Sequence, residues 1–308
     1  MELKVFSRWV IRNWLFRRGR VGRSKARRVF NFLLGPQEVV EVAPGLKLAL
    51  DLRKNIQESA FWFFEEVEPA LQWTIKHLLP VGGVFIDVGA NIGLMGLLAA
   101  YYRNARVMFV EPHPRLAQSL WENIALNAYA GSAIMHQLAA SNIAGEVVLH
   151  GHPTNDGGHS IDPPSGATET FRVPARRLAD LLNEEAMTFV DLLKVDVEGY
   201  DFEVLDGLGL MLDPCHVGMI FVEMEHRDVF NMKVWNILME RGYAPFGPIG
   251  ALHIDQLHRL DRLARSGKAV TIFRPIIAPG QAINHLWCPR GGSVAELLLR
   301  IHRAAVNA

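Results

Sequence analysis

The chain is poor in cysteine, in net charge and in long hydrophobic runs, and each shortage excludes a class of protein. Two cysteines in 308 residues, Cys215 and Cys288, argue against a disulfide framework and for a reducing compartment. Lys and Arg together number 32, as do Asp and Glu, so no global positive field indicates a nucleic-acid partner. No apolar run reaches the roughly 20 residues of a membrane-spanning helix or resembles the core of a secretory signal. We therefore expect a cytoplasmic protein that binds no nucleic acid.

The even balance of charge conceals a basic arm at the start of the chain. Residues 1–28 hold ten Lys or Arg and a single acid, Glu2, and arginines are interleaved with Trp9 and Trp14. One interpretation is an amphipathic helix in peripheral contact with an anionic membrane, at the inner membrane surface. The other, which we favour, is a solvated helix that packs its tryptophans on the body of the protein. We assign residues 1–34 to this arm.

Beyond the arm, an extension leads into a regular alternation of strands and helices. Residues 35–80 contain two strand-like runs around a Pro-Gly turn, followed by apolar residues at helical spacing over 59–80. From 81 to 308 the spacing is that of βα units, which predicts a doubly wound, mostly parallel α/β sheet with its ligand crevice at the carboxyl ends of the strands. Insertions near 150–170 and 248–268 are expected to act as lids. The expected strands are 84–88, 106–110, 133–138, 146–150, 170–174, 190–197, 217–223, 269–273 and 284–288.

The turn after the first strand of this domain, in VFIDVGANIGLMG, is rich in glycine. Asp87 ends the strand, and Gly89 and Gly93 let the backbone approach a ligand without a Cβ in the way. Asn91 stands where a dinucleotide site has its second glycine, which leaves less room for a pyrophosphate. Glu111 ends the next strand, where such folds place an acid on the ribose hydroxyls. The pattern favours S-adenosylmethionine, with Glu111 at its ribose and Asp87 at its amino-acid end.

Five stretches, in order, resemble a known family: VFIDVGANIG, FVEPHPRLAQSLWENIALN, LAASNIAGEVVL, LLKVDVEGYDFEVLDG and IFVEMEH. From about residue 84 to 243, roughly half of the chain, the sequence is similar to the FkbM-type S-adenosylmethionine-dependent methyltransferases. The resemblance implies a class I methyltransferase fold with an antiparallel last strand, and methyl transfer usually to a hydroxyl oxygen. It also implies a cofactor-binding set, in which residues 138–141 lie near the adenine. That set is Asp87, Gly89, Asn91, Gly93, Glu111, Pro112 and Ala139.

Two positions depart from the family pattern. Ala179 stands in RRLADLL where the family commonly has an acid, and Glu225 stands where it often has a histidine, with His226 one step on. Neither departure touches the cofactor motif, but either one affects how a substrate is handled.

Charged residues gather where the fourth and fifth strands of the domain end. In VDLLKVDVEGYDF (190–202) a two-residue period aims Lys194, Asp196 and Glu198 the same way, and Glu223 ends the following strand. Asp196 or Glu198 could be the general base for an acceptor hydroxyl, the carboxylates could hold a divalent metal, or the group could be a structural ion-pair network. We favour catalysis for the two acids and no metal. Lys194 completes the candidate catalytic set by balancing Asp196 or Glu223.

Three hypotheses about function follow. The leading one is an S-adenosylmethionine-dependent O-methyltransferase acting on a sugar, polyketide-like or other small polyhydroxyl acceptor. The second is a metal-dependent nucleotide-sugar glycosyltransferase that uses Asp196 and Glu198 as metal ligands. The third is a catalytically inactive, membrane-surface cofactor-binding protein, in which Ala179 and Glu225 mark the loss of catalysis.

Overall fold

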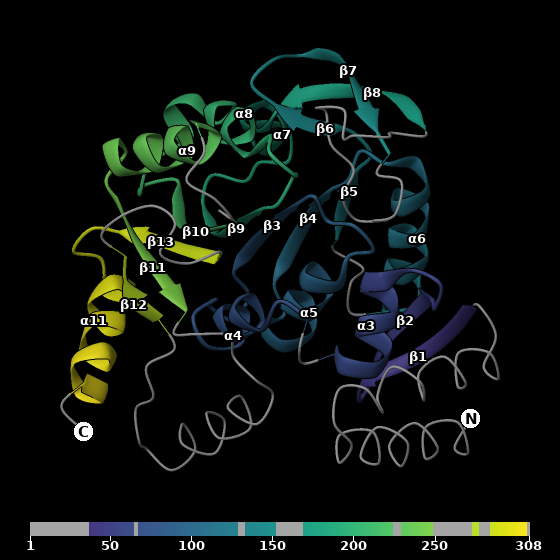
Figure 1. The fold of residues 1–308 in the computed structure, drawn as a ribbon, viewed down its shortest axis with the longest axis horizontal. Coiled ribbons are helices and arrows are strands. Elements are labelled where there is room, and N and C mark those ends of the chain that lie inside the picture. The colour runs from purple at the N-terminus through teal and green to yellow at the C-terminus, as the bar shows by residue number, and fades with distance from the viewer. Residues whose placement is uncertain are drawn as a thin grey trace.

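A mixed sheet of eight strands forms the centre of the computed structural model, which describes residues 37–64, 67–128, 133–151, 169–223, 229–248, 273–276 and 284–306 (Figure 1). The strand order is β12-β11-β13-β10-β9-β3-β4-β5. Neighbours from β5 to β10 pair in parallel, whereas β13, the last strand, is antiparallel to β10 and β11. This arrangement confirms the predicted fold class. The strands are β3 (Val84–Val88), β4 (Arg106–Val110), β5 (Ile134–His136), β9 (Val190–Val195), β10 (Val217–Glu223), β11 (Tyr243–Pro248), β12 (Phe273–Pro275) and β13 (Asn284–Pro289).

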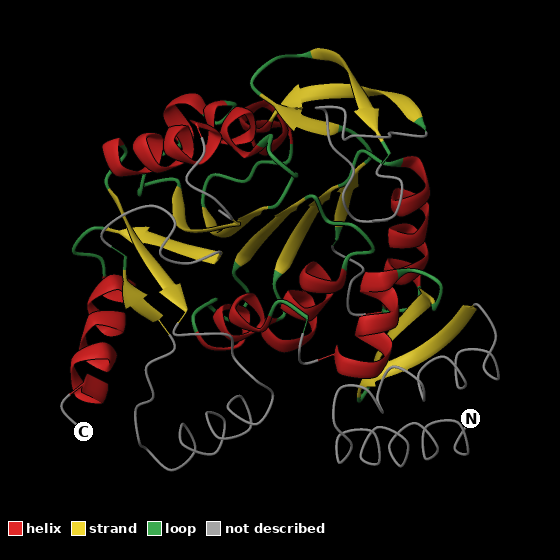
Figure 2. Cartoon of the chain, in the orientation of Figure 1, coloured by secondary structure: helices red, strands yellow, loops and turns green. Residues whose placement is uncertain are grey.

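Helices cover both faces of this sheet, because its central strands are apolar on both sides (Figure 2). Within β3, Phe85 packs into one hydrophobic cluster and the next residue, Ile86, packs into the other. One face carries α4 (Pro69–His77), α5 (Leu94–Arg103), α6 (Pro114–Ala125) and α11 (Ser293–Val306), and the other carries α7 (Leu178–Glu184), α8 (Asp201–Asp206) and α9 (Val229–Glu240). The carboxyl ends of the parallel strands remain as the edge at which such sheets bind ligands.

A smaller sheet of three strands lies beside the carboxyl ends of β4 and β5 (Figure 1). The predicted hairpin is confirmed, since β7 (Gly145–His150) pairs antiparallel with β8 (Thr170–Arg177). The short strand β6 (Ala139–Ser141) pairs in parallel with β8. This pairing fixes the segment that holds Ala139.

The extension before the domain is fastened to α6 and to the residues just after it by two buried asparagines. Strands β1 (Gln37–Ala43) and β2 (Leu46–Asp51) form the predicted antiparallel pair. Asn123 Oδ1 accepts a hydrogen bond from the N–H of Ala49 at 2.7 Å, and Asn127 Oδ1 accepts one from the N–H of Lys47 at 2.9 Å. The extension therefore packs on the domain rather than standing apart from it.

The helical spacing predicted over 59–80 corresponds to two helices rather than one. Helix α3 (Asn55–Phe63) is followed by α4, whose first residue is Pro69. Proline cannot donate a backbone hydrogen bond and disfavours the helical conformation in the residue before it. Glu68 accordingly has a left-handed backbone, with φ of 43° and ψ of 57°. The prediction of one helix over 59–80 was therefore wrong. Glu68 lies in the break between the two helices and has a non-helical backbone.

Several predicted features lie outside the described residues. They are the basic arm, most of the insertion near 150–170, and the insertion near 248–268. Peripheral membrane contact through residues 1–28 therefore stays a prediction. Of the helices that the structure describes, none combines the length and the apolar character needed to cross a bilayer.

Candidate active site

The turn between β3 and α5 brings the glycine loop against the end of β9. Gly89 has φ of 72°, and a Cβ placed on it would lie 1.9 Å from the carbonyl oxygen of Asp196. Only glycine tolerates both this conformation and this approach. The N–H groups of Gly89 and Ala90 donate to the carbonyl oxygen of Val110 at 3.0 and 3.2 Å. The loop is thus fixed between the ends of β4 and β9.

Gly93 has a packing role that the sequence did not indicate. It does not line the cavity described below, and a Cβ on it would lie 2.2 Å from Leu120 Cδ1 of α6. It is the residue just before α5, and its φ is 84°. Gly93 therefore makes room for the packing of α6, and the predicted approach of its backbone to a ligand stays a prediction.

Glu111 is buried and already oriented by backbone donors. Its Oε2 accepts a hydrogen bond from the N–H of Asn91 at 2.7 Å, and its Oε1 accepts one from the N–H of His113 at 2.9 Å. Burial raises the pKa of Glu111 to about 7, although these two hydrogen bonds act in the opposite direction. Each carboxylate oxygen keeps a lone pair for a further donor. Such a group is suited to accept hydrogen bonds from a pair of hydroxyls.

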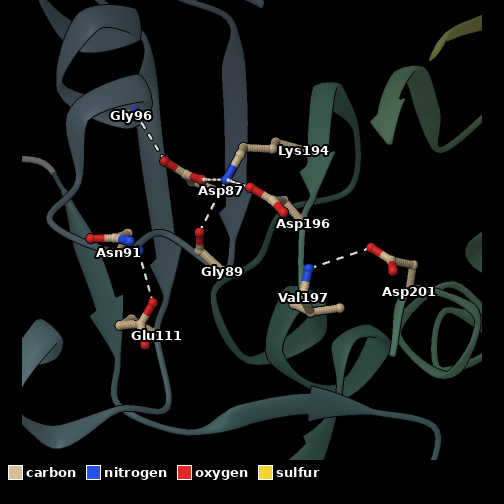
Figure 3. A network of polar contacts seen from close by, with 9 residues as sticks. All are labelled: Asp87, Gly89, Asn91, Gly96, Glu111, Lys194, Asp196, Val197 and Asp201. Carbon is tan, nitrogen blue, oxygen red and sulfur yellow. Dashed lines mark hydrogen bonds and ion pairs between the residues drawn. The ribbon is translucent and has the colours of Figure 1, made fainter. Parts of the chain in front are cut away.

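Lys194 joins the glycine loop to two carboxylates (Figure 3). Its Nζ donates to the carbonyl oxygen of Gly89 at 3.0 Å and lies 3.1 Å from Asp196 Oδ2 and 3.5 Å from Asp87 Oδ1. Burial lowers the pKa of Lys194, but Asp196, Asp87 and Glu68 outweigh it, and the pKa ends well above its ordinary value. The predicted pair with Asp196 is confirmed, and Asp87 is a partner that the sequence did not indicate.

Asp87 is buried at the end of β3, with 1% of its surface exposed. Its Oδ2 accepts a hydrogen bond from the N–H of Gly96 at 3.0 Å. Its Oδ1 accepts no hydrogen bond from any residue that the structure describes and has only the ion pair with Lys194. Burial raises the pKa of Asp87, with Lys194 opposing that shift.

A cavity of about 270 Å³ lies over these groups. Every predicted site residue except Gly93 lines it, including Pro112, Ala139, Glu198 and Glu223. Among the charged residues of the described lining, Glu68 alone was missed, and the Glu-Pro dipeptide was the signal that could have revealed it. The described lining contains one ammonium, that of Lys194, and six carboxylates, which are those of Glu68, Asp87, Glu111, Asp196, Glu198 and Glu223.

The two departures from the family pattern are not part of this described lining. Ala179 is buried near the start of α7, where its N–H donates to the carbonyl oxygen of Gly207 at 3.3 Å. Glu225 and His226 lie outside the described residues. In the part of the chain covered by the structure, no group of three or more His, Cys, Asp or Glu has the arrangement of a metal site.

The strand order, the antiparallel β13 and the glycine turn beside an acid at the next strand end define a class I S-adenosylmethionine-dependent methyltransferase fold. The profile described as Methyltransferase FkbM domain matches residues 87–245, just over half of the chain. The chain belongs to the FkbM methyltransferase family. Membership in a methyltransferase family argues against the glycosyltransferase hypothesis.

Curated relatives carry the same type of name. The chain is 30% identical over 160 residues to Methyltransferase sdnD of Sordaria araneosa. The matched region covers 42% of this chain and 62% of that protein. It is 29% identical over 149 residues to Methyltransferase 1 of Beauveria bassiana (strain ARSEF 2860). Here the matched region covers 42% of this chain and 59% of the relative. The chain thus spans about three fifths of the length of the curated relatives it matches.

Solved structures of methyltransferases are also similar to the chain. P. horikoshii TYW2 in complex with MeSAdo is 15% identical, with a TM-score of 0.41 and coverage of 86% of this chain and 80% of that one. The METTL16 MTase domain is 12% identical, with a TM-score of 0.41 and coverage of 79% and 74%.

The residues that line the cavity fit S-adenosylmethionine, which supplies a methyl group on a sulfonium sulfur when it is bound. Glu111 offers two fixed acceptors for the ribose hydroxyls. Asp87 Oδ1 is a buried acceptor without a hydrogen bond from the described residues, at the end of the strand that precedes the glycine loop. Ala139 and Pro112 add apolar surface to the cavity, and the position of the adenine near residues 138–141 stays a prediction.

Substitution of Glu111 by glutamine is expected to weaken binding of S-adenosylhomocysteine and of 5′-methylthioadenosine about 10- to 100-fold, because both carry the ribose. The glutamine amide would point an N–H group at one of the backbone donors that now serve the carboxylate. Isothermal titration calorimetry measures both affinities. Glu146→Gln, at an exposed position on β7, is the matched control and should change neither.

The pH dependence gives a second check on Glu111. Ribose hydroxyls bind the ionised carboxylate better, and a pKa of about 7 makes that form scarce at pH 6. Wild-type affinity for 5′-methylthioadenosine should rise about tenfold from pH 6 to pH 8, and Glu111→Gln should flatten this rise. An unchanged slope in the variant would contradict the assignment.

Proposed function

We propose that the protein transfers the methyl group of S-adenosylmethionine to a hydroxyl oxygen of a small, uncharged polyhydroxyl acceptor, such as a sugar or a polyketide-like compound. The observation that carries this proposal is the position of Asp196, Glu198 and Glu223, which line the same cavity as Glu111 and Asp87. They follow or end the neighbouring parallel strands β9 and β10.

The charge of the cavity supports an acceptor of this class. With six carboxylates and one ammonium among its described lining residues, the cavity disfavours carboxylate and phosphate groups on the acceptor. Hydroxyl groups, in contrast, donate hydrogen bonds to carboxylates. Several acids around one cavity can therefore orient a molecule that carries several hydroxyls.

Asp196 is the carboxylate that we assign as proton acceptor. Its Oδ2 is held 3.1 Å from Lys194 Nζ, and about a third of its side chain is exposed, at 32%. A general base has to be both fixed in position and reachable by the hydroxyl. Glu198 is more exposed, on a turn where it has a φ of 51°. Glu198 and Glu223 are assigned to the other hydroxyls of the acceptor.

Methyl transfer from tritium-labelled S-adenosylmethionine to a panel of acceptors tests this function. Neutral polyhydroxyl compounds should become labelled and their acidic analogues should not. The label should also resist alkaline hydrolysis, as an ether does and a methyl ester does not. Labelling confined to acidic acceptors, or an alkali-labile product, would overturn the proposal.

With an active acceptor in hand, Asp196→Asn is expected to lower kcat by about 100- to 10,000-fold, the usual contribution of a general base. Glu198→Gln should act mainly on the KM for the acceptor. Affinity for S-adenosylhomocysteine, measured in parallel, separates a loss of chemistry from a loss of cofactor binding. If Asp196→Asn kept a kcat near that of wild type, Asp196 would not be the base, and another acid would have to accept the proton.

A further inference from the structure

Glu68 reaches the cavity from outside the family domain. It lies between α3 and α4, whereas the FkbM domain covers residues 87–245, and it lines the same cavity as Asp87 and Lys194. Its left-handed backbone is uncommon for a residue other than glycine, asparagine or aspartate. A side chain held in an unfavourable backbone conformation needs support from its surroundings.

That support comes from Gln72, a buried residue of α4 with 4% of its surface exposed. Its Nε2 donates to the carbonyl oxygens of Phe64 and Val67, both at 2.7 Å. The N–H of Gln72 donates to the carbonyl oxygen of Glu68 at 3.0 Å. Three hydrogen bonds from one residue thus hold the backbone on both sides of Glu68 and at Glu68 itself, so the place where its side chain leaves the backbone is fixed by the fold.

The charge around Glu68 is unbalanced. Its carboxylate interacts electrostatically with Lys194, Asp196 and Asp87, which makes three acids around one ammonium. Burial raises the pKa of Glu68 to about 7, with Asp196 and Asp87 adding to the rise and Lys194 opposing it. Asp87 Oδ1 still accepts no hydrogen bond within the described part of the chain. A cationic hydrogen-bond donor would relieve both deficits.

The cavity that Glu68 shares with Glu111 and Asp87 indicates which cation fits. Lys194 Nζ lies 3.5 Å from Asp87 Oδ1 and 3.1 Å from Asp196 Oδ2, and both of these acids line that cavity. A ligand with its ribose on Glu111 can therefore also contact the acids around Lys194, including Glu68. S-adenosylmethionine has two cationic groups, and of these only the α-ammonium carries N–H donors.

We infer that Glu68 binds the α-ammonium group of S-adenosylmethionine and so completes the amino-acid end of the cofactor site from outside the FkbM domain. This inference rests on the proposed function. Glu68 is charge-complementary to that ammonium, while Asp87 and Lys194 hold the neighbouring part of the site. The extension before the domain would thus contribute a binding residue, Glu68, to the cofactor site.

The test compares S-adenosylhomocysteine, which has the ammonium, with 5′-methylthioadenosine, which lacks the amino-acid portion. Glu68→Gln in the full chain is expected to weaken S-adenosylhomocysteine binding about 10- to 100-fold and to leave 5′-methylthioadenosine within about twofold of wild type. Glu68→Asp keeps the charge and should restore part of the loss. Calorimetry measures all affinities, with Glu146→Gln as the control.

Comparing the two ligands over pH separates Glu68 from Glu111. From pH 6 to pH 8, wild-type affinity for S-adenosylhomocysteine should rise about tenfold more than affinity for 5′-methylthioadenosine, because Glu68 must lose its proton to bind the ammonium. Glu68→Gln should bring the two slopes together. Equal effects of Glu68→Gln on both ligands, or no effect on either, would overturn the inference. If the wild type bound neither ligand, the cofactor assignment itself would fail, and the inference with it.

Discussion

Replacement of Gly89 by alanine is expected to lower the affinity for S-adenosylhomocysteine by at least about 100-fold, to the point where calorimetry detects no binding. The new methyl group would lie 1.9 Å from the carbonyl oxygen of Asp196, so the glycine loop or the end of β9 has to move by more than about 1 Å. Either movement breaks the hydrogen bond from Lys194 Nζ to the carbonyl oxygen of Gly89. Thermal unfolding should also show a clear loss of stability.

Gly82 provides a matched control for this substitution. Its φ of 74° is close to the 72° of Gly89, but a Cβ on Gly82 meets nothing within 4 Å. Gly82→Ala therefore carries only the backbone penalty, about 1–2 kcal/mol, and should leave cofactor affinity unchanged. If Gly89→Ala were no more harmful than Gly82→Ala, the close approach to Asp196 would not matter for the site.

Several strands of the domain could be predicted from the sequence to the residue, whereas β6 and β11 were not predicted and the prediction 190–197 runs past the end of β9. The bounds 84–88, 106–110 and 217–223 agree with β3, β4 and β10, because short apolar runs between turn residues are specified locally. Helix starts agree less well. The apolar residues after the glycine turn already include Ile92, which predicts a helix start there, but α5 begins at Leu94, because Gly93 takes a left-handed conformation that a helix cannot contain.

Most of the site could also be predicted, since parallel strands bring their carboxyl ends to one edge. What the sequence could not provide was the pairing between distant segments. Lys194 could be paired with Asp196 by its position along β9, but its contact with Asp87 depends on the register between β3 and β9. The contact of Gly93 with Leu120 likewise depends on how α6 packs.

Glu68 was missed for a further reason. The apolar residues of 59–80 have helical spacing on both sides of Pro69, so periodicity alone continues the helix through the break. The direction of the Glu68 side chain then follows from its left-handed backbone and from the hydrogen bonds of Gln72. Neither is visible in a pattern of apolar residues.

Lys194→Met is expected to be the most destabilising substitution at the site, with a loss of about 3–5 kcal/mol in the free energy of unfolding at pH 8. Methionine fills a similar volume, but the ammonium that balances Asp87 and Asp196 is gone, and Asp87 is buried. Denaturant titration measures the loss. Lys47→Met, at an exposed position on β2, should leave the free energy of unfolding within about 0.5 kcal/mol of wild type.

The pH dependence of this loss distinguishes an unpaired charge from a packing defect. The pKa of Lys194 lies well above 10.5, so its own contribution in the wild type is constant from pH 5 to pH 8. In the variant, burial and the charge of Asp196 still raise the pKa of Asp87, and of the opposing effects only the hydrogen bond from Gly96 remains, so protonation at low pH relieves the unpaired charge. The deficit should therefore be smaller at pH 5 than at pH 8, and adding Asp87→Asn should recover part of the stability at pH 8. A deficit that is independent of pH and is not reduced by Asp87→Asn would mean that Lys194 stabilises the fold through its packing rather than through its charge.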